Sequence, residues 1–281
     1  MVCRGGPVTI DVAVMVSGYC TAHRRVEDPT GPGGHRRFYA TWLVIRHPKL
    51  GIVLFDTGYS DHVFRAARHL PDRAHLWVTP VTVAPQETAV ARLAAMGITV
   101  DDVKHVIISH FHVDHIGGLR DFPAATIYAT AAAYGQVRQV QGVAAVRRGV
   151  LRGLLPDDLQ ERIVMVEDVA EAMADPDSDL TMYRTFMGQQ ELVPVLLPGH
   201  ARGMLGLYIP SQRMLFATDA AWSSDTFRRG VLPRQVVRLF FDSWSGFVQT
   251  QQQLRAFIRA NPDVNLLFTH CPDTMQFVAH A

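Results

Sequence analysis

The sequence predicts an α+β protein in which two β-sheets stack face to face and helices flank them. Strand-like runs fill the first third of the chain and return in its last third, and a helical stretch follows each group of strands. Hydrophobic residues make up 48% of the 281 residues and charged residues 19%, proportions that fit a large packed core.

The first third of the chain contains three predicted strands, rich in β-branched and aromatic residues and separated by glycine and proline turns. We place them at residues 8–17, 39–46 and 51–55. A helix is predicted over residues 85–96, because Val90, Leu93 and Ala94 share one face and Gly97 ends the pattern. Two more strands follow, a buried one at residues 106–108 and a short one at 124–129.

The segment from residue 131 to about 188 has a different composition, dominated by alanine, arginine and glutamine. Pro156, Asp157 and Asp158 have the form of a helix start. We therefore expect a mainly helical insertion at 131–188 within a single domain that spans residues 1–281. Strand patterns return after it, and a helix is predicted between the last two of them; the strands are at 192–197, 206–209, 213–217 and 264–268, and the helix at 247–259.

Composition excludes several classes of function. The formal net charge of +1 gives no electrostatic basis for binding nucleic acid or a membrane surface. No apolar run approaches the length of a membrane-spanning helix, and the N-terminus lacks the form of a signal peptide. The three cysteines form neither a CxxC pair nor an even disulfide framework, which favours a reducing compartment. We therefore expect a cytoplasmic protein.

The most informative stretch is a cluster of metal-ligand side chains directly after the buried strand at 106–108. His110, His112, Asp114 and His115 fall within six residues, and Gly117 and Gly118 follow. The first three alternate as in a strand, whereas His115 breaks the alternation, so a loop leaving the strand can direct these side chains to two points in space. Imidazole nitrogen and carboxylate oxygen are ligands that suit zinc, with iron or manganese as competitors.

Three more strand ends carry a residue of the same type. His200, Asp219 and His270 each come directly after an apolar strand pattern. A lone histidine in such a place is more often structural. Three such residues in a chain that already holds the dense cluster instead predict one shared metal site.

On these residues the chain resembles the metallo-β-lactamase superfamily. The matching motifs are Phe55-Asp56-Thr57-Gly58, the cluster at 110–118, Gly199-His200, Asp219 and His270. The resemblance implies a single domain with the αββα four-layer sandwich, two mixed sheets flanked by helices, and a dinuclear metal site at one edge. It also implies that His110, His112 and His200 hold one ion, that Asp114, His115 and His270 hold the second, and that Asp219 bridges them.

The chemistry of such a site assigns roles to its carboxylates. Two divalent ions about 3.5–4 Å apart repel each other, so a bridging carboxylate, Asp219, and a bridging hydroxide are needed between them. The hydroxide is the expected nucleophile, because metal-bound water loses its proton near neutral pH. Asp114 is placed to carry a proton to the leaving group. Asp56 is expected to accept the outer N–H of a metal-bound histidine. The expected cofactors are two zinc ions, with iron or manganese as alternatives.

Within the superfamily the layout is most similar to lactonases of the acyl-homoserine-lactone and pyridoxolactone kind. The resemblance implies a hydrolase that opens a small-molecule lactone or a related ester. Signal-degrading lactonases carry a tyrosine three residues after the bridging aspartate, where this chain has Trp222, which offers an N–H donor but no phenol. We expect the substrate pocket to include Trp222, Phe111, Arg202 and Phe227.

Other functions stay open at this point. Thioesters need the same nucleophile as lactones, and phosphodiesters would need additional cationic contacts that only loop arginines could supply. A non-hydrolytic biosynthetic member of the superfamily is a third alternative. The sequence leaves the oligomeric state open, a homodimer included.

Overall fold

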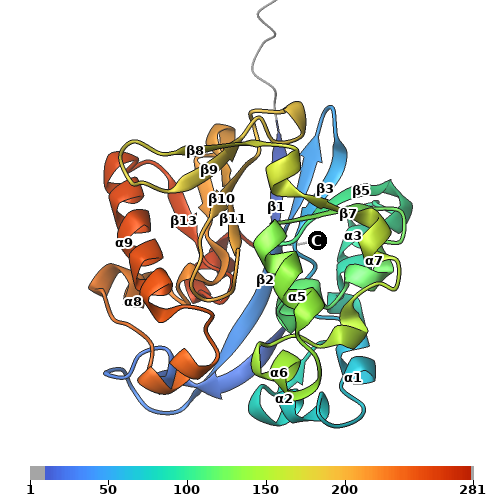
Figure 1. The fold of residues 1–281 in the computed structure, drawn as a ribbon, viewed down its shortest axis with the longest axis vertical. Helices are drawn as coiled ribbons and strands as arrows, with labels where there is room; N and C mark the ends of the chain where they lie inside the picture. The colour runs from blue at the N-terminus through green and yellow to red at the C-terminus, as the bar shows by residue number, and fades with distance from the viewer. Residues whose placement is uncertain (1–9, 280–281) are drawn as a thin grey trace, which may run out of the picture.

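The computed structural model describes residues 10–279 and contains two β-sheets packed face to face between two layers of helices (Figure 1). The predicted αββα sandwich is confirmed. The first sheet has the strand order β4-β1-β2-β3-β5-β6-β7. Its strands are β1 (Asp11–His23), β2 (His35–His47), β3 (Gly51–Phe55), β4 (Val81–Thr82), β5 (Val103–Ile107), β6 (Thr126–Ala129) and β7 (Ile163–Met165). Residues 8 and 9 of the first predicted strand lie outside the described residues.

The second sheet has the strand order β13-β12-β11-β10-β9-β8. Its strands are β8 (Glu171–Ala174), β9 (Thr181–Arg184), β10 (Val193–Leu196), β11 (Leu205–Ile209), β12 (Met214–Phe216) and β13 (Asn265–Leu267). Both sheets are mixed, because β3, β5, β6 and β7 pair in parallel in the first sheet and β12 and β13 in the second, while the other pairings are antiparallel.

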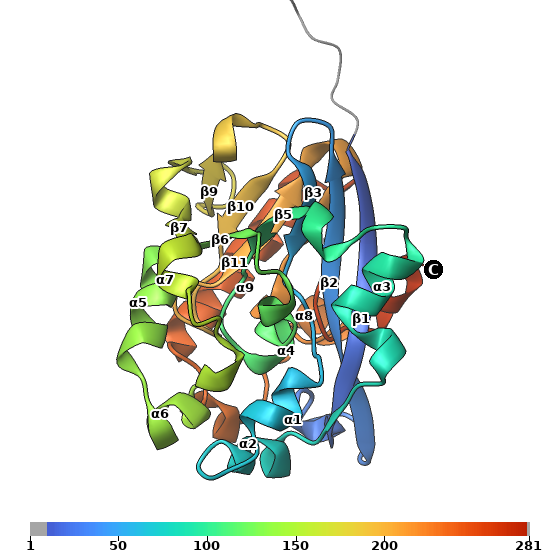
Figure 2. The same cartoon turned by 90° about the vertical axis from the view of Figure 1, so that its right-hand side faces the viewer.

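Helices cover the outer face of each sheet. The outer face of the first sheet packs against α1 (His62–Ala66), α2 (Arg73–Val78), α3 (Ala89–Ala95), α4 (Val113–Ile116), α5 (Ala131–Gln139), α6 (Gly142–Arg147) and α7 (Leu159–Arg162). The outer face of the second sheet packs against α8 (Ser224–Arg229) and α9 (Trp244–Ala260). Figures 1 and 2 show α1, α2 and α6 together at the end of the sandwich away from the start of β1.

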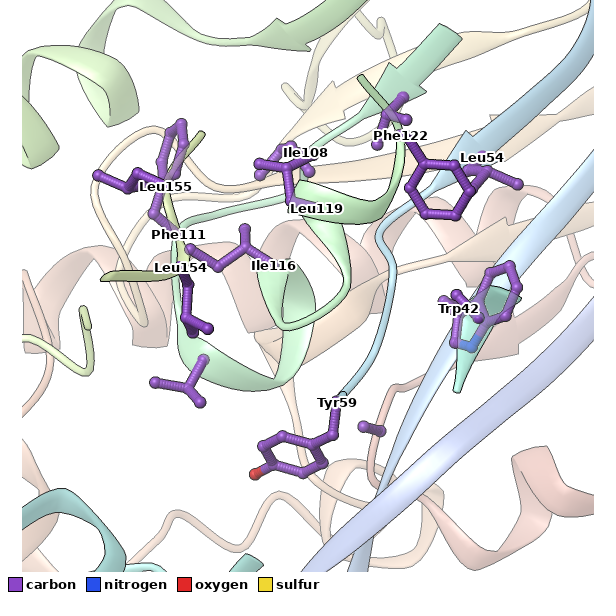
Figure 3. Packing of buried hydrophobic residues seen from close by; sticks show 14 of the residues in the cluster. Trp42, Leu54, Tyr59, Ile108, Phe111, Ile116, Leu119, Phe122, Leu154 and Leu155 are labelled. Carbon is purple, nitrogen blue, oxygen red and sulfur yellow. The ribbon is translucent and has the colours of Figure 1, made fainter. Parts of the chain in front are cut away.

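Strand side chains alternate between two cores, as the pleat of a strand requires. On β2 and β3, Leu43 and Phe55 point into the core between the sheets, whereas Trp42 and Leu54 point into the core beneath the outer helices. Figure 3 shows part of this outer core, including Trp42, Leu54 and Ile116. All of these side chains are at most 1% exposed, and each such burial stabilises the fold by about 1.5–3 kcal/mol.

Strand direction gathers several carboxyl ends at one edge of the sandwich. In the first sheet β3 and β5 are parallel neighbours. In the second sheet β10, β12 and β13 share one direction, because β10 and β12 are both antiparallel to β11 and β13 is parallel to β12. The segments that follow these five strands, with the helices α4 and α8 among them, carry all the candidate site residues.

The segment 131–188 differs from its prediction as a mainly helical insertion. Its first part is helical, with α5, α6 and α7, but its second part forms β7, β8 and β9 at the edges of both sheets. β7 is only three residues long and β8 is exposed throughout, so neither has the longer buried apolar run that marked the central strands. None of the helices within residues 10–279 is long and apolar enough to span a membrane.

Candidate metal centre

The histidine loop changes its backbone direction after His112. β5 ends at Ile107, and His112 still has an extended backbone with φ −72° and ψ 156°. The single helical turn of α4 follows at once and rotates Asp114 and His115 away from His110 and His112. The strand end and the helical turn therefore direct the two pairs to two neighbouring points.

The loop after β3 packs directly against α4. A Cβ atom added at Gly117 would lie 2.5 Å from the carbonyl oxygen of Gly58, so no larger residue fits there without movement. Thr57 donates its backbone N–H (2.8 Å) and its hydroxyl (3.0 Å) to the carbonyl oxygen of His115. Asp56 has the left-handed φ of 64°, which costs a non-glycine residue about 1–2 kcal/mol and is held by these contacts.

The other three candidate ligands follow strand ends of the second sheet. His200 follows β10, Asp219 follows β12 and His270 follows β13. The loops of Asp219 and His270 are joined by a hydrogen bond of 3.1 Å from the backbone N–H of Thr269 to the carbonyl oxygen of Thr218.

The structure brings all seven predicted ligands together in two overlapping groups. Within each group the ligand atoms lie within 4.8 Å of one another. We call them the first group, which contains His110, His112, His200 and Asp219, and the second group, which contains Asp114, His115, Asp219 and His270. The division is the one that the resemblance implied.

Asp219 lies between the two groups. Its Oδ2 atom is 3.2 Å from Nε2 of His200 and 3.2 Å from Nε2 of His270. The same oxygen is 3.6 Å from Nε2 of His115 and 4.0 Å from Nε2 of His110. One carboxylate therefore faces histidines of both groups.

Asp56 and Ser109 support the histidines from outside the centre. Oδ2 of Asp56 is 2.7 Å from Nδ1 of His115, and the Ser109 hydroxyl donates to the same carboxylate oxygen at 2.7 Å. The Ser109 hydroxyl oxygen is also 3.0 Å from Nδ1 of His110. These contacts fix the ring orientations so that the Nε2 atoms of both histidines face the centre.

Several atoms that face the centre lack a hydrogen-bond partner within residues 10–279. Nε2 of His110, Nε2 of His115 and Oδ1 of Asp219 are all buried in this way. An unpaired buried polar atom costs about 1–3 kcal/mol, so a protein rarely keeps several in one place unless something else satisfies them. Nitrogen and oxygen donors in this arrangement fit divalent metal ions such as zinc.

Two histidines of the first group, His110 and His112, are held in the neutral form that binds metal. Burial lowers the pKa of His110 and His112 well below the usual value, and the neighbouring histidines lower both further. A neutral imidazole keeps a lone pair for a metal ion.

The shared carboxylate is held ionised. Burial acts to raise the pKa of Asp219, but the imidazoles of His270, His115 and His200 hold it well below its usual range. In the second group, burial acts to lower the pKa of His115, and the carboxylates of Asp114, Asp56 and Asp219 outweigh it, so that this pKa is well above its usual value. A divalent cation would take the place of this proton.

The predicted pocket residue Trp222 lies beside the centre, whereas Arg202 contacts Asp242. The Trp222 ring packs edge-on against His200, with ring centroids 6.3 Å apart, and against Phe241 at 6.0 Å. Nε1 of Trp222 is buried and has no partner in the described part of the chain. Arg202 is half exposed, and its Nε lies 3.4 Å from a carboxylate oxygen of Asp242.

Phe111 and Phe227 pack in apolar cores, and their predicted pocket role stays a prediction. Phe111 is 4% exposed and belongs to the core beneath the outer helices of the first sheet, where it lies near Leu155 (Figure 3). Phe227 is 6% exposed and packs against Phe268 in the core of the second sheet. Both residues lie close in sequence to candidate ligands, but strand and helix geometry point their side chains into apolar cores.

Sequence reasoning missed three residues around the centre. Ser109 and Arg36 contact the ligands or their backbone, and His75 of α2 has a buried Nε2 without a partner among residues 10–279. Burial lowers the pKa of His75, and Asp114 opposes this shift. A serine before the cluster could have indicated support, but nothing in the sequence distinguishes Arg36 or His75 from a surface residue.

The chain matches a known protein family. The family model described as the metallo-beta-lactamase superfamily matches residues 35–257. The N-acyl homoserine lactonase AttM of Azorhizobium caulinodans is 26% identical over 258 residues, which cover 90% of this chain and 89% of the relative. A probable metallo-hydrolase of Mycobacterium bovis is 26% identical over 245 residues, covering 80% and 73% of the two chains.

Solved structures share the fold. An N-acyl homoserine lactone hydrolase with the product N-hexanoyl-L-homoserine bound at its catalytic metal centre has a TM-score of 0.69 and 17% identity, with 96% of each chain covered. The dizinc quorum-quenching lactonase AidC has a TM-score of 0.62 and 15% identity, with coverage of 95% and 89%.

Proposed function

Since the chain belongs to the metallo-β-lactamase superfamily, we propose that it is a dinuclear metal-dependent hydrolase that opens a lactone or a related ester. The observation that carries this proposal is the position of Asp219 Oδ2, which is 3.2 Å from both His200 Nε2 and His270 Nε2. A carboxylate shared by two groups of ligands is what a pair of neighbouring cations requires. The relatives support the same class of enzyme, because they are named as metallo-hydrolases and lactonases.

We assign His110, His112 and His200 to one ion, Asp114, His115 and His270 to the other, and Asp219 to both. Zinc is the metal we propose, with iron or manganese as alternatives, and the dizinc structural neighbour supports zinc. When bound, such ions lower the pKa of a coordinated water to about 7 and polarise a carbonyl oxygen, which supplies a nucleophile without a serine or cysteine.

The chain's own carboxylates complete the chemistry. Asp219 stays ionised beside its histidines and keeps its oxygens available to both groups. The Asp114 side chain is 14% exposed, and its Oδ2 lies 3.4 Å from Nε2 of His270. It is therefore placed to carry a proton from the attacking water to the leaving alkoxide at the open side of the centre. Asp56 has no route to substrate because it is fully buried, and we assign it the orientation of His115.

The surroundings favour an uncharged substrate over a phosphodiester. The wall beside His200 is aromatic, formed by Trp222 and Phe241. The arginines around it are paired, since Arg202 and Arg148 both lie within 4 Å of Asp242 and Arg36 lies 2.9 Å from Glu27. The lactonases among the relatives support a lactone as the small-molecule substrate. A single domain and a cytoplasmic location remain predictions from the sequence, and the oligomeric state, a homodimer included, stays open.

The test is metal analysis of the purified protein combined with a panel of lactones, thioesters and aryl phosphodiesters. We expect two metal ions per chain and turnover of at least one lactone that is lost after chelation and restored by Zn²⁺. Activity on phosphodiesters alone would replace the lactonase proposal. Stoichiometric metal without hydrolysis of any member of the panel would favour a non-hydrolytic family member.

A further inference from the structure

Strand β2 of the first sheet contacts the His270 loop of the second sheet at successive positions. The Thr41 hydroxyl donates to the carbonyl oxygen of Thr269 at 2.8 Å. Nδ1 of His270 is 2.8 Å from the carbonyl oxygen of Tyr39, so an N–H at this nitrogen donates to that oxygen. The Phe38 ring packs edge-on against the His270 ring with centroids 5.9 Å apart. Contacts from the opposite sheet therefore surround this one candidate ligand.

Arg36 completes this set and joins two ligand loops. Its Nη2 atom donates to the carbonyl oxygen of Trp222 at 3.1 Å and to the carbonyl oxygen of His270 at 3.2 Å. One nitrogen with two N–H bonds therefore ties the loop that follows Asp219 to the loop that carries His270. These are the loops of the shared carboxylate and of the histidine found only in the second group.

The guanidinium is itself fixed on two sides. Nη1 of Arg36 is 2.9 Å from a carboxylate oxygen of Glu27, and the two side chains are only 13% and 5% exposed. The guanidinium also lies 4.1 Å above the centre of the Phe38 ring. An arginine held by a buried ion pair and an aromatic face loses little further freedom when it binds two carbonyl groups. Such an arrangement is well suited to fixing the positions of the Trp222 and His270 carbonyl groups.

We propose that Arg36 is a positioning residue for the second group, acting through the backbone of His270 and Trp222 rather than on substrate. The proposal rests on the proposed metal centre. Without the guanidinium, the His270 carbonyl and the Trp222 carbonyl lose their common donor, and the His270 loop is held to the first sheet by fewer contacts. The first group should be much less affected, because none of the contacts of Arg36 reaches His110, His112 or His200.

The test measures the affinity of each Zn²⁺ ion separately, by competition of the metal-free protein with a chromophoric chelator. In Arg36→Met we expect the affinity of one ion to fall about 10–100-fold, as for other residues that orient ligands, while the affinity of the other stays within about threefold. The Zn²⁺ ion that binds more weakly in Arg36→Met should be the same ion whose binding His270→Ala abolishes. Arg36→Lys keeps a charge and a donor, so it should recover part of the loss.

The neighbouring arginine provides a matched control. Arg37 is exposed and lies over the Tyr19 ring on the other face of β2, so Arg37→Met should leave both Zn²⁺ affinities unchanged. Thermal unfolding of the metal-free proteins separates positioning from general damage to the fold. If Arg36→Met fails to fold, the two Zn²⁺ affinities of Arg36→Lys are measured instead. A weaker affinity for one ion alone would support the proposal, and equal affinities for both ions in the variant and the unmodified protein would contradict it.

Three results would overturn the inference. They are unchanged affinities in Arg36→Met, an equal loss for both ions, and a lowered unfolding temperature with both affinities intact. Failure of the proposed metal centre gives a different result, because the unmodified protein would then bind fewer than two Zn²⁺ ions. Failure of the proposed reaction alone would leave these affinities unchanged and would show only in the substrate panel.

Discussion

The two groups of the candidate centre differ in how their histidines are held. In the second group, both His115 and His270 have a firm outer partner, the Asp56 carboxylate at 2.7 Å and the Tyr39 carbonyl at 2.8 Å. In the first group, His110 has only the shared Ser109 hydroxyl, and Nδ1 of His200 has no partner among the described residues.

The two groups show that a ligand motif and the residues that support it come from separate parts of the chain. The first group is shaped mainly by packing, since a Cβ added at Gly149 would lie 2.8 Å from the His112 ring and Phe241 lies 4.9 Å from the His200 ring. The second group is shaped by hydrogen bonds from β2 and from the loop after β3. Substitutions should therefore separate the two groups.

The largest expected effect belongs to the residue that the groups share. Asp219→Ala should lose both ions and reduce turnover by about 10³-fold or more, because several kcal/mol of transition-state stabilisation depend on the metal centre. Metal content and kcat are the measurements, with the exposed Asp263→Ala as the control. An Asp219→Ala protein with full metal and full activity would refute the assignment.

A smaller, one-sided effect is expected from Asp56→Asn. The substitution removes the charge that orients His115, so the Zn²⁺ of the second group should bind about 10–100-fold more weakly while the other ion changes little. Stepwise Zn²⁺ titration measures both steps, and Asp61→Asn at an exposed site is the control. An equal loss of affinity for both Zn²⁺ ions would show that the two groups are not supported separately.

Removal of metal should lower stability without unfolding the protein. Ions present at 100 times their dissociation constant stabilise the folded state by about 2.7 kcal/mol each. For a chain of this size that corresponds to a fall of roughly 5–10 °C in Tm after chelation. Calorimetry with and without a chelator checks this, and an unchanged Tm would argue against tight binding by buried ligands.

The smallest effects distinguish the pocket from the core. Trp222→Phe should raise KM several-fold with little change in Tm, because its ring borders the centre. Phe227→Leu should instead lower stability by about 1 kcal/mol and leave kcat/KM unchanged, because this ring packs against Phe268. The reverse pattern in kinetics and thermal unfolding would restore Phe227 to the pocket.

The sequence predicted the central part of the fold well, for a physical reason. Strands β3 and β5 both end in buried segments, so residues 52–55 and 106–108 appear as short continuous apolar runs. β7 is only three residues long, β8 is exposed throughout, and β9 is a short strand between β8 and β10, so none of the three has a strong strand pattern. The helical prediction for 131–188 failed at these strands.

The same distinction applies to the site. The seven candidate ligands could be found because each follows a strand and is of a metal-binding type. Arg36 and Tyr39 could not be found, because Arg36 acts on carbonyl groups more than 180 residues away in sequence and Tyr39 contributes only a backbone oxygen. The core packing of Phe111 and Phe227 could not be predicted either, because closeness in sequence to a ligand does not fix the direction of a side chain.

Asp219 is proposed to lie between two cations that are held by separate groups of ligands. Anomalous diffraction from crystals of the Zn²⁺-loaded protein measures the positions of both ions relative to this carboxylate. We expect two zinc peaks per chain, about 3.5–4 Å apart, one on each side of the Asp219 carboxylate. A single peak, or two peaks without Asp219 between them, would contradict the account.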